Sequence, residues 1–137
     1  MTMTPAELTT FLVGAFPDFD PRRYIVEEAT DHGVRLRLGV TARDARPGGT
    51  VLGPSLMELA DIAAYLCVLA PIGPVALAVT TSLTIHFLRK PRLADVLAEA
   101  RALKRGKRLC VIVVTMSTAG EDEPVAHATV TYAVPRT

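Results

Sequence analysis

The 137-residue sequence has few cysteines, almost no excess charge and no targeting signal. Its two cysteines, neither in a C-x-x-C pair, cannot form a disulfide framework, so reduced thiols and a cytoplasmic location are expected. Fifteen basic and fourteen acidic residues leave a net charge of +1, which argues against a nucleic-acid partner. The N-terminal segment lacks the basic start and apolar core of a signal peptide. The longest apolar stretch, 62–72, is interrupted by Pro71, and we expect it to be too short to cross a membrane.

Several motifs of catalysis and cofactor binding are also missing. No histidine or cysteine pair has zinc-ligand spacing, so no metal is expected. Gly48-Gly49 is not part of a nucleotide-binding loop, and no motif places a histidine beside Ser55 for a catalytic triad. The remaining candidates are predicted to be structural residues of a turn, a strand or the core: His32, His86, His127, Cys67 and Cys110. His86 could alternatively reach a site from its strand.

The length and a hydrophobic content of 50% predict one folded domain over residues 1–137. Thr4, Pro5 and Glu7 form a helix-start pattern, and the N-terminal helix is expected within residues 1–17. Short turns between the later apolar runs predict an antiparallel sheet. The expected order after the first helix is strands over 24–30 and 34–40, a loop over 42–52, a helix over 53–70, and strands over 75–88, 95–104, 108–117 and 124–134.

The helix predicted over 53–70 is apolar on almost every side, which indicates that a sheet wraps around it. Gly53 is the candidate N-cap, and Pro71 with Gly73 is expected to end the helix. Gly53 also presents a backbone N–H at the positive end of the helix dipole, where it could bind a developing oxyanion. The alternative is an ordinary Gly-Pro helix start.

Three polar residues, Glu58, Asp61 and Tyr65, interrupt the apolar helix at offsets of three and four, so they share one face. Carboxylates on a largely buried helix need solvent or partners. One interpretation is a general base or nucleophile in a site. The other is that Glu58 and Asp61 mark the solvent-facing side of the helix.

Two segments, GGTVLGPSLMELADIAAYL and VTTSLTIHFLRKP, resemble the loop-helix and following strand of hotdog-fold thioesterases of the phenylacetate-degradation (PaaI-like) type. The resemblance extends from about Tyr24 to Pro135. It implies an α+β hotdog fold, with an antiparallel sheet around a long central helix. It also implies hydrolysis of acyl-CoA or a related thioester, with coenzyme A as part of the substrate and no separate cofactor.

The resemblance also assigns roles to residues. The catalytic acid of the family falls on Asp61 and its oxyanion glycine on Gly53, while Thr80, beside Thr81, is the hydroxyl that orients water from the opposing subunit. The site would lie between subunits of a homodimer, and such dimers often form tetramers. This sequence departs from the family pattern at three positions: Leu52 replaces a histidine, Pro54 a glycine and Arg46 an asparagine.

Other residues are candidates for contact with the substrate. Glu58 is a second candidate base, and Glu58, Tyr65 and Thr81 are expected to bind the substrate or its coenzyme A part. Cations at two hairpin turns could hold coenzyme A phosphates or could simply be solvated turn residues: Arg89, Lys90, Arg92, Lys104, Arg105, Lys107 and Arg108. The first helix could pack on the sheet or act as a lid over an acyl pocket.

Two other functions stay open. One is a non-catalytic module that binds acyl-CoA or fatty-acyl groups. The other is a hydratase or dehydratase, which usually needs an Asp and a His in one loop-helix motif, and the helix here has no histidine.

Overall fold

The computed structural model describes residues 2–135, and its elements follow the predicted order. The loop predicted over 42–52 contains three short elements, the 3-10 helix η1 (Ala42–Asp44) and the paired strands β3 (Ala45–Arg46) and β4 (Thr50–Val51). The larger elements are α1 (Pro5–Ala15), β1 (Tyr24–Ala29), β2 (Gly33–Leu38), α2 (Gly53–Ile72), β5 (Val79–Phe87), β6 (Val96–Arg105), β7 (Leu109–Thr118) and β8 (Pro124–Ala133).

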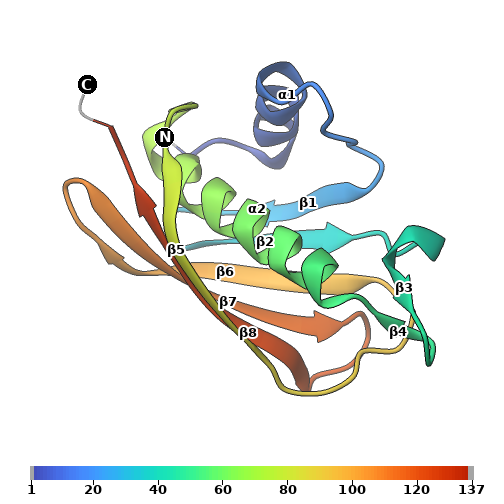
Figure 1. Cartoon of the computed structure of the whole chain (residues 1–137). Coiled ribbons are helices and arrows are strands. Elements are labelled where there is room, and N and C mark those ends of the chain that lie inside the picture. Colours follow the sequence, from blue (N-terminus) through green and yellow to red (C-terminus); the bar gives the residue numbers. More distant parts are fainter. Residues whose placement is uncertain (1, 136–137) are drawn as a thin grey trace.

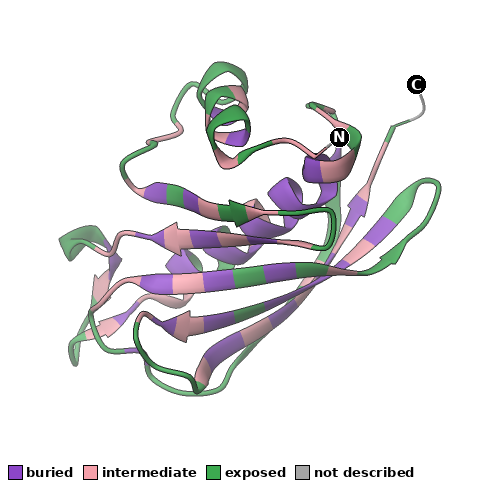
Figure 2. Ribbon diagram, turned by 180° about the vertical axis from the view of Figure 1, so that it is seen from behind, coloured by how far each residue is buried: buried purple, intermediate pink, exposed green. Residues whose placement is uncertain are grey.

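Six strands form one antiparallel sheet in the order β1-β2-β6-β7-β8-β5, and the sheet curls around α2 (Figure 1). Side chains along the central strands alternate between buried and accessible positions (Figure 2). The buried set packs against the leucines and alanines of α2 and forms the hydrophobic core. This arrangement confirms the expected α+β hotdog fold.

Both ends of α2 differ from the prediction. Leu52 is the N-cap, so Gly53 is the first helical residue. At the other end the helix continues through Pro71 to Ile72, and Gly73 ends it with a φ of 99°. Pro71 has no N–H, which leaves the carbonyl of Cys67 without its helical donor. Arg105 replaces that donor, because its Nη2 donates to the Cys67 oxygen at 2.7 Å. A cation at this end also suits the helix dipole.

The apolar stretch belongs to a helix that is longer than the expected one. Because α2 has 20 residues, it passes the length and composition criteria for a membrane-spanning helix. The sheet and α1 bury 67% of its most hydrophobic window, as they would bury the core helix of a folded domain.

Two β-bulges determine which side chains face α2. The register between β5 and β8 shifts at Thr81, so Thr80 lies opposite the inward-facing Tyr132. The register between β6 and β7 shifts at Leu103, so Arg105 lies opposite the buried Cys110 and reaches the helix end. The strand predicted from residue 75 begins only at residue 79, because residues 76–77 form a turn.

Candidate active site

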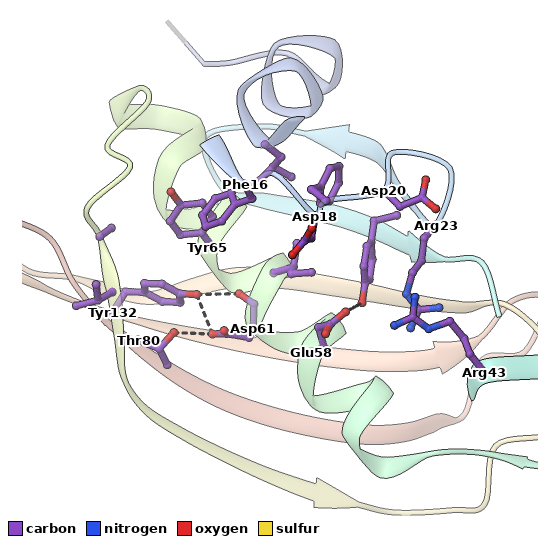
Figure 3. Close-up of a pocket in the computed structure, with 16 residues that line it drawn as sticks. Phe16, Asp18, Asp20, Arg23, Arg43, Glu58, Asp61, Tyr65, Thr80 and Tyr132 are labelled. Atoms are coloured by element: carbon purple, nitrogen blue, oxygen red, sulfur yellow. Dashed lines mark hydrogen bonds between the residues drawn. The ribbon is translucent and has the colours of Figure 1, made fainter. Parts of the chain in front are cut away.

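Asp61 lies in the middle of α2, and two hydroxyl groups hold its carboxylate (Figure 3). Its Oδ1 accepts hydrogen bonds from Thr80 Oγ1 at 2.7 Å and from the Tyr132 hydroxyl at 2.8 Å. Among residues 2–135 no side chain donates to Oδ2. One oxygen is therefore anchored while the other is available to a water molecule or a substrate.

Thr80 makes this contact within one chain. The expectation that its hydroxyl acts from the opposing subunit is corrected here, because the bulge at Thr81 turns Thr80 toward the Asp61 of its own helix. Thr81 itself donates to the carbonyl of Thr131 at 3.2 Å and does not contact Asp61.

Tyr132 was not singled out from the sequence. The alternation of the last strand places it on the inward face, but nothing in the sequence shows which helix residue it meets. Burial raises the pKa of Tyr132 well above its ordinary value. A hydrogen bond with Thr80 lowers this pKa, whereas the negative charge of Asp61 raises it further. The phenol therefore stays protonated and remains a hydrogen-bond donor to the carboxylate.

Asp61 opens into a cavity of about 700 Å³, a volume typical of small-molecule sites. The stripe predicted from the sequence is confirmed as one face, because Glu58, Asp61 and Tyr65 all line this cavity. Leu12 and Phe16 line it as well, and Leu8 and Leu12 are buried. The first helix thus packs on the domain and also forms part of a cavity wall.

Glu58 lies one helical turn before Asp61 and accepts a short hydrogen bond from the hydroxyl of Tyr24. Burial raises the pKa of Tyr24, and the hydrogen bond and charge of Glu58 raise it further. Tyr24 is therefore a neutral donor that fixes the Glu58 carboxylate. The hydroxyl of Tyr65 donates to the carbonyl of Ala76 at 3.2 Å, so this ring is fixed as part of the wall.

Gly53 opens into a different cavity, of about 560 Å³, at the start of α2. As the first helical residue it has an N–H without an intrahelical acceptor, and no hydrogen bond among the described residues uses this group. Asp61 is eight residues further along, which corresponds to about 12 Å of helix. Within one chain, the carboxylate and the N–H therefore do not meet around one carbonyl group.

The start of α2 is held by Asp44, a buried residue that the sequence pattern did not indicate. Its carboxylate accepts two hydrogen bonds from Arg23, at 2.8 and 2.6 Å, one from Ser55 Oγ at 2.7 Å and one from the Thr41 N–H at 3.0 Å. Burial alone would raise the pKa of Asp44, but Arg23 and the two neutral donors outweigh it and hold the pKa well below its usual range. Through Asp44, the residue before β1 is connected to Ser55 in the first turn of α2.

The predicted phosphate-binding cations occupy several different places. Arg89 and Lys90 line the Gly53 cavity, and Arg46 joins them there. Arg89 also pairs with Glu123, as Arg92 pairs with Glu121. Arg105 contacts the end of α2, whereas Lys104, Lys107 and Arg108 lie around a shallow cleft at the β6–β7 hairpin.

The histidines lie away from both cavities. His86 and His127 are paired across β5 and β8 on the outer face of the sheet, which agrees with the strand positions predicted for them. His32 lies at the bend between β1 and β2. No histidine lines the Asp61 or Gly53 cavity in the described part of the chain, so no Asp-His pair supports a hydratase.

Residues 48–132, more than half of the chain, match the sequence pattern of the Thioesterase superfamily. The chain belongs to this superfamily. A presumed thioesterase from Silicibacter sp. TM1040 is 38% identical and has a TM-score of 0.88, with 98% of this chain and 93% of the other covered. A presumed thioesterase related to phenylacetic acid degradation, from Ralstonia eutropha JMP134, is 28% identical and has a TM-score of 0.68. The match covers 74% of this chain and 76% of the other.

Zebra fish thioesterase superfamily member 2 shares the fold, with a TM-score of 0.84 at 19% identity over 98% of this chain and 100% of the other. No functionally curated protein matches the chain significantly. Superfamily membership supports acyl thioester hydrolysis as the general chemistry.

Proposed function

We propose that this thioesterase-superfamily protein hydrolyses acyl-CoA thioesters and that Asp61 supplies the general base or nucleophile. The observation that carries the proposal is the Asp61 carboxylate itself. Thr80 and Tyr132 anchor one oxygen, and the second oxygen opens into a cavity large enough for an acyl group. A positioned carboxylate of this kind can take a proton from water as the water attacks the thioester carbonyl.

We further infer that each site is completed by a second copy of the chain, because the carboxylate and the free N–H of one chain open into different cavities. β5 connects the two halves of the site. Thr80, near its start, contacts Asp61, and Phe87, at its end, lies against Gly53, where an added Cβ would be 3.3 Å from the ring.

β5 is an edge strand, and its outward row of backbone groups faces no other strand among the described residues (Figure 1). Pairing of two antiparallel β5 strands about a two-fold axis near Leu83 would bring the start of one strand to the end of the other. Asp61 and Thr80 would then lie beside Gly53 of the partner subunit. The exposed edge of β5 thus supports a homodimer with two shared sites.

In this dimer the thioester carbonyl would accept a hydrogen bond from the partner's Gly53 N–H, which stabilises the oxyanion as the carbonyl is attacked. Asp61 either deprotonates the attacking water or attacks directly to form an anhydride, which water then hydrolyses. The C–S bond breaks, and coenzyme A leaves as a thiolate that needs little help from an acid. Arg46 and Lys90 give the same cavity a positive charge suited to coenzyme A phosphates, and Arg89, which pairs with Glu123, lies beside them.

The test is release of free thiol from a panel of acyl-CoAs, with wild type, Asp61→Asn and Glu58→Gln compared. The panel includes phenylacetyl-CoA, because of the similarity to the phenylacetic acid degradation-related protein. Asp61→Asn should lower kcat about 100-fold or more, as expected for loss of a general base or nucleophile. Glu58→Gln is the matched control, since it removes a neighbouring carboxylate that the mechanism does not use. Full activity of Asp61→Asn would refute the proposal.

The alternative is a module that binds acyl-CoA without turning it over. The observation that favours it is Leu52, which precedes the Gly53 N–H and has an aliphatic side chain that cannot donate a hydrogen bond to an oxyanion. In that case wild type should release no thiol from any substrate, while acyl-CoAs still raise the melting temperature of both wild type and Asp61→Asn.

A further inference from the structure

The cavity beside Asp61 has one wall that comes from the chain between α1 and β1. Phe16, Asp18, Phe19 and Asp20 supply this wall and line the same cavity as Asp61 and Glu58 of α2. All four wall residues precede residue 48, where the match to the superfamily begins. The wall is therefore a feature of this chain's N-terminal part, and the common chemistry of the superfamily does not require it.

The wall is aromatic in a chain with only 5% aromatic residues. Phe19 stacks on Tyr24 with ring centroids 6.0 Å apart, and Phe16 meets Tyr65 edge to face at 5.6 Å. These two pairs present ring surfaces to the interior of the cavity. Such surfaces bind apolar groups well and offer few hydrogen bonds to a charged one.

The same wall carries negative charge. Asp18 projects from the loop toward α2 (Figure 3) and forms no ion pair within the described residues. Arg23 does not neutralise it, because its guanidinium is bound to Asp44. Arg43 lies at the opposite end of the cavity from Asp61 (Figure 3). The part of the cavity next to the reacting carboxylate is thus anionic.

We propose that the segment from Phe16 to Asp20 determines acyl specificity: it admits neutral, apolar acyl groups and rejects acyl groups that end in a carboxylate. The inference rests on the proposed thioesterase function and names its substrate class. A terminal carboxylate would enter a space that already contains the negative charges of Asp18 and Glu58, where like charges repel.

The test compares valeryl-CoA with glutaryl-CoA, which have the same number of acyl carbons and differ by the terminal carboxylate. Wild type should favour valeryl-CoA in kcat/KM by about tenfold or more. Asp18→Lys should shift this ratio toward glutaryl-CoA by about tenfold. Asp31→Lys, in the exposed β1–β2 turn, is the control, because it changes the net charge equally far from the cavity. Equal ratios in the two lysine variants would overturn the proposal.

A second comparison tests the aromatic part of the wall. Phe16→Ala should raise KM for valeryl-CoA about tenfold and leave acetyl-CoA less affected, because only the longer chain reaches the ring. Val13→Ala is the control, since Val13 is an exposed α1 residue that does not line the cavity. An equal effect of Phe16→Ala on both substrates would contradict the assigned role.

Binding separates failure of this inference from failure of the proposed function. Non-hydrolysable thioether analogues of valeryl-CoA and glutaryl-CoA can be titrated by calorimetry into Asp61→Asn, with and without Asp18→Lys. If no thioester is hydrolysed but the analogue preference changes with Asp18→Lys, only the hydrolase function fails. If hydrolysis occurs and the preference does not change, only the specificity role of the segment fails.

Discussion

Replacing Asp44 by alanine should strongly destabilise the protein, although Asp44 takes no part in the proposed chemistry. The side chains of Asp44 and Arg23 are only 1% and 9% exposed. Alanine would leave a buried guanidinium without its carboxylate, and would also remove the acceptor of the Ser55 hydroxyl and the Thr41 N–H. Breaking a buried ion pair from one side costs about 3–5 kcal/mol. For a domain of this size that corresponds to a fall in Tm of about 10–20 °C.

Urea unfolding at pH 7, followed by circular dichroism, measures this loss for Asp44→Ala. Replacing both partners, as Asp44→Leu with Arg23→Met, should recover much of the stability, because no charge is then left buried. Asp20→Ala is the control, since its pair with Arg22 is exposed and should contribute less than about 1 kcal/mol. A loss below about 1 kcal/mol for Asp44→Ala would refute the reasoning.

The same pair predicts a pH dependence. The pKa of Asp44 is held well below its usual range in the folded state, so the folded protein favours the ionised carboxylate. Its contribution to stability is complete above the unfolded-state pKa of about 4 and is lost as the pH falls from there toward the folded-state value. The free energy of unfolding of wild type should therefore fall more steeply below pH 4 than that of Asp44→Asn.

Four further variants, at three positions, test other parts of the structure. Gly53→Pro should lower kcat about 100-fold or more, because it removes the oxyanion N–H. Gly53→Ala is the control: it adds the same Cβ near Phe87 but keeps the N–H, so its kcat should fall far less. Tyr132→Phe should lower kcat about tenfold, because it removes one of the two hydroxyl donors that position Asp61. An unchanged kcat would show that Tyr132 does not position Asp61. Arg105→Ala should destabilise the fold by about 1–3 kcal/mol in urea unfolding, because the buried Cys67 carbonyl loses its donor, and full stability would contradict this contact.

Much of the fold could be predicted from the sequence because local patterns determine it. The capping box of α1, the alternation in β2 and the apolar character of α2 each depend on neighbouring residues, and each element is found where it was expected. The end of α2 could not be predicted, because its last turn depends on Arg105, which lies 38 residues further along the chain. The short β3–β4 ribbon could not be predicted either, because strands of two residues are too short to show an alternating pattern.

The candidate site was predicted only in part. Glu58, Asp61 and Tyr65 could be grouped because helical spacing alone places them on one face. Tyr132 and Asp44 could not be linked to α2, because β-strand pairing and a buried ion pair bring distant segments together. A local pattern likewise could not show that Gly53 and Asp61 open into separate cavities, because that depends on how the sheet closes around the helix.

The most direct test of the central claim is subunit complementation between Asp61→Asn and Gly53→Pro. Each variant alone should release almost no thiol from the best acyl-CoA. If two chains share each site, mixing equal amounts and allowing subunits to exchange should restore about a quarter of wild-type activity, because half of the dimers then contain one intact site. If the mixture stays inactive although native mass spectrometry shows mixed dimers, Asp61 and Gly53 do not act across the subunit interface and the account is wrong.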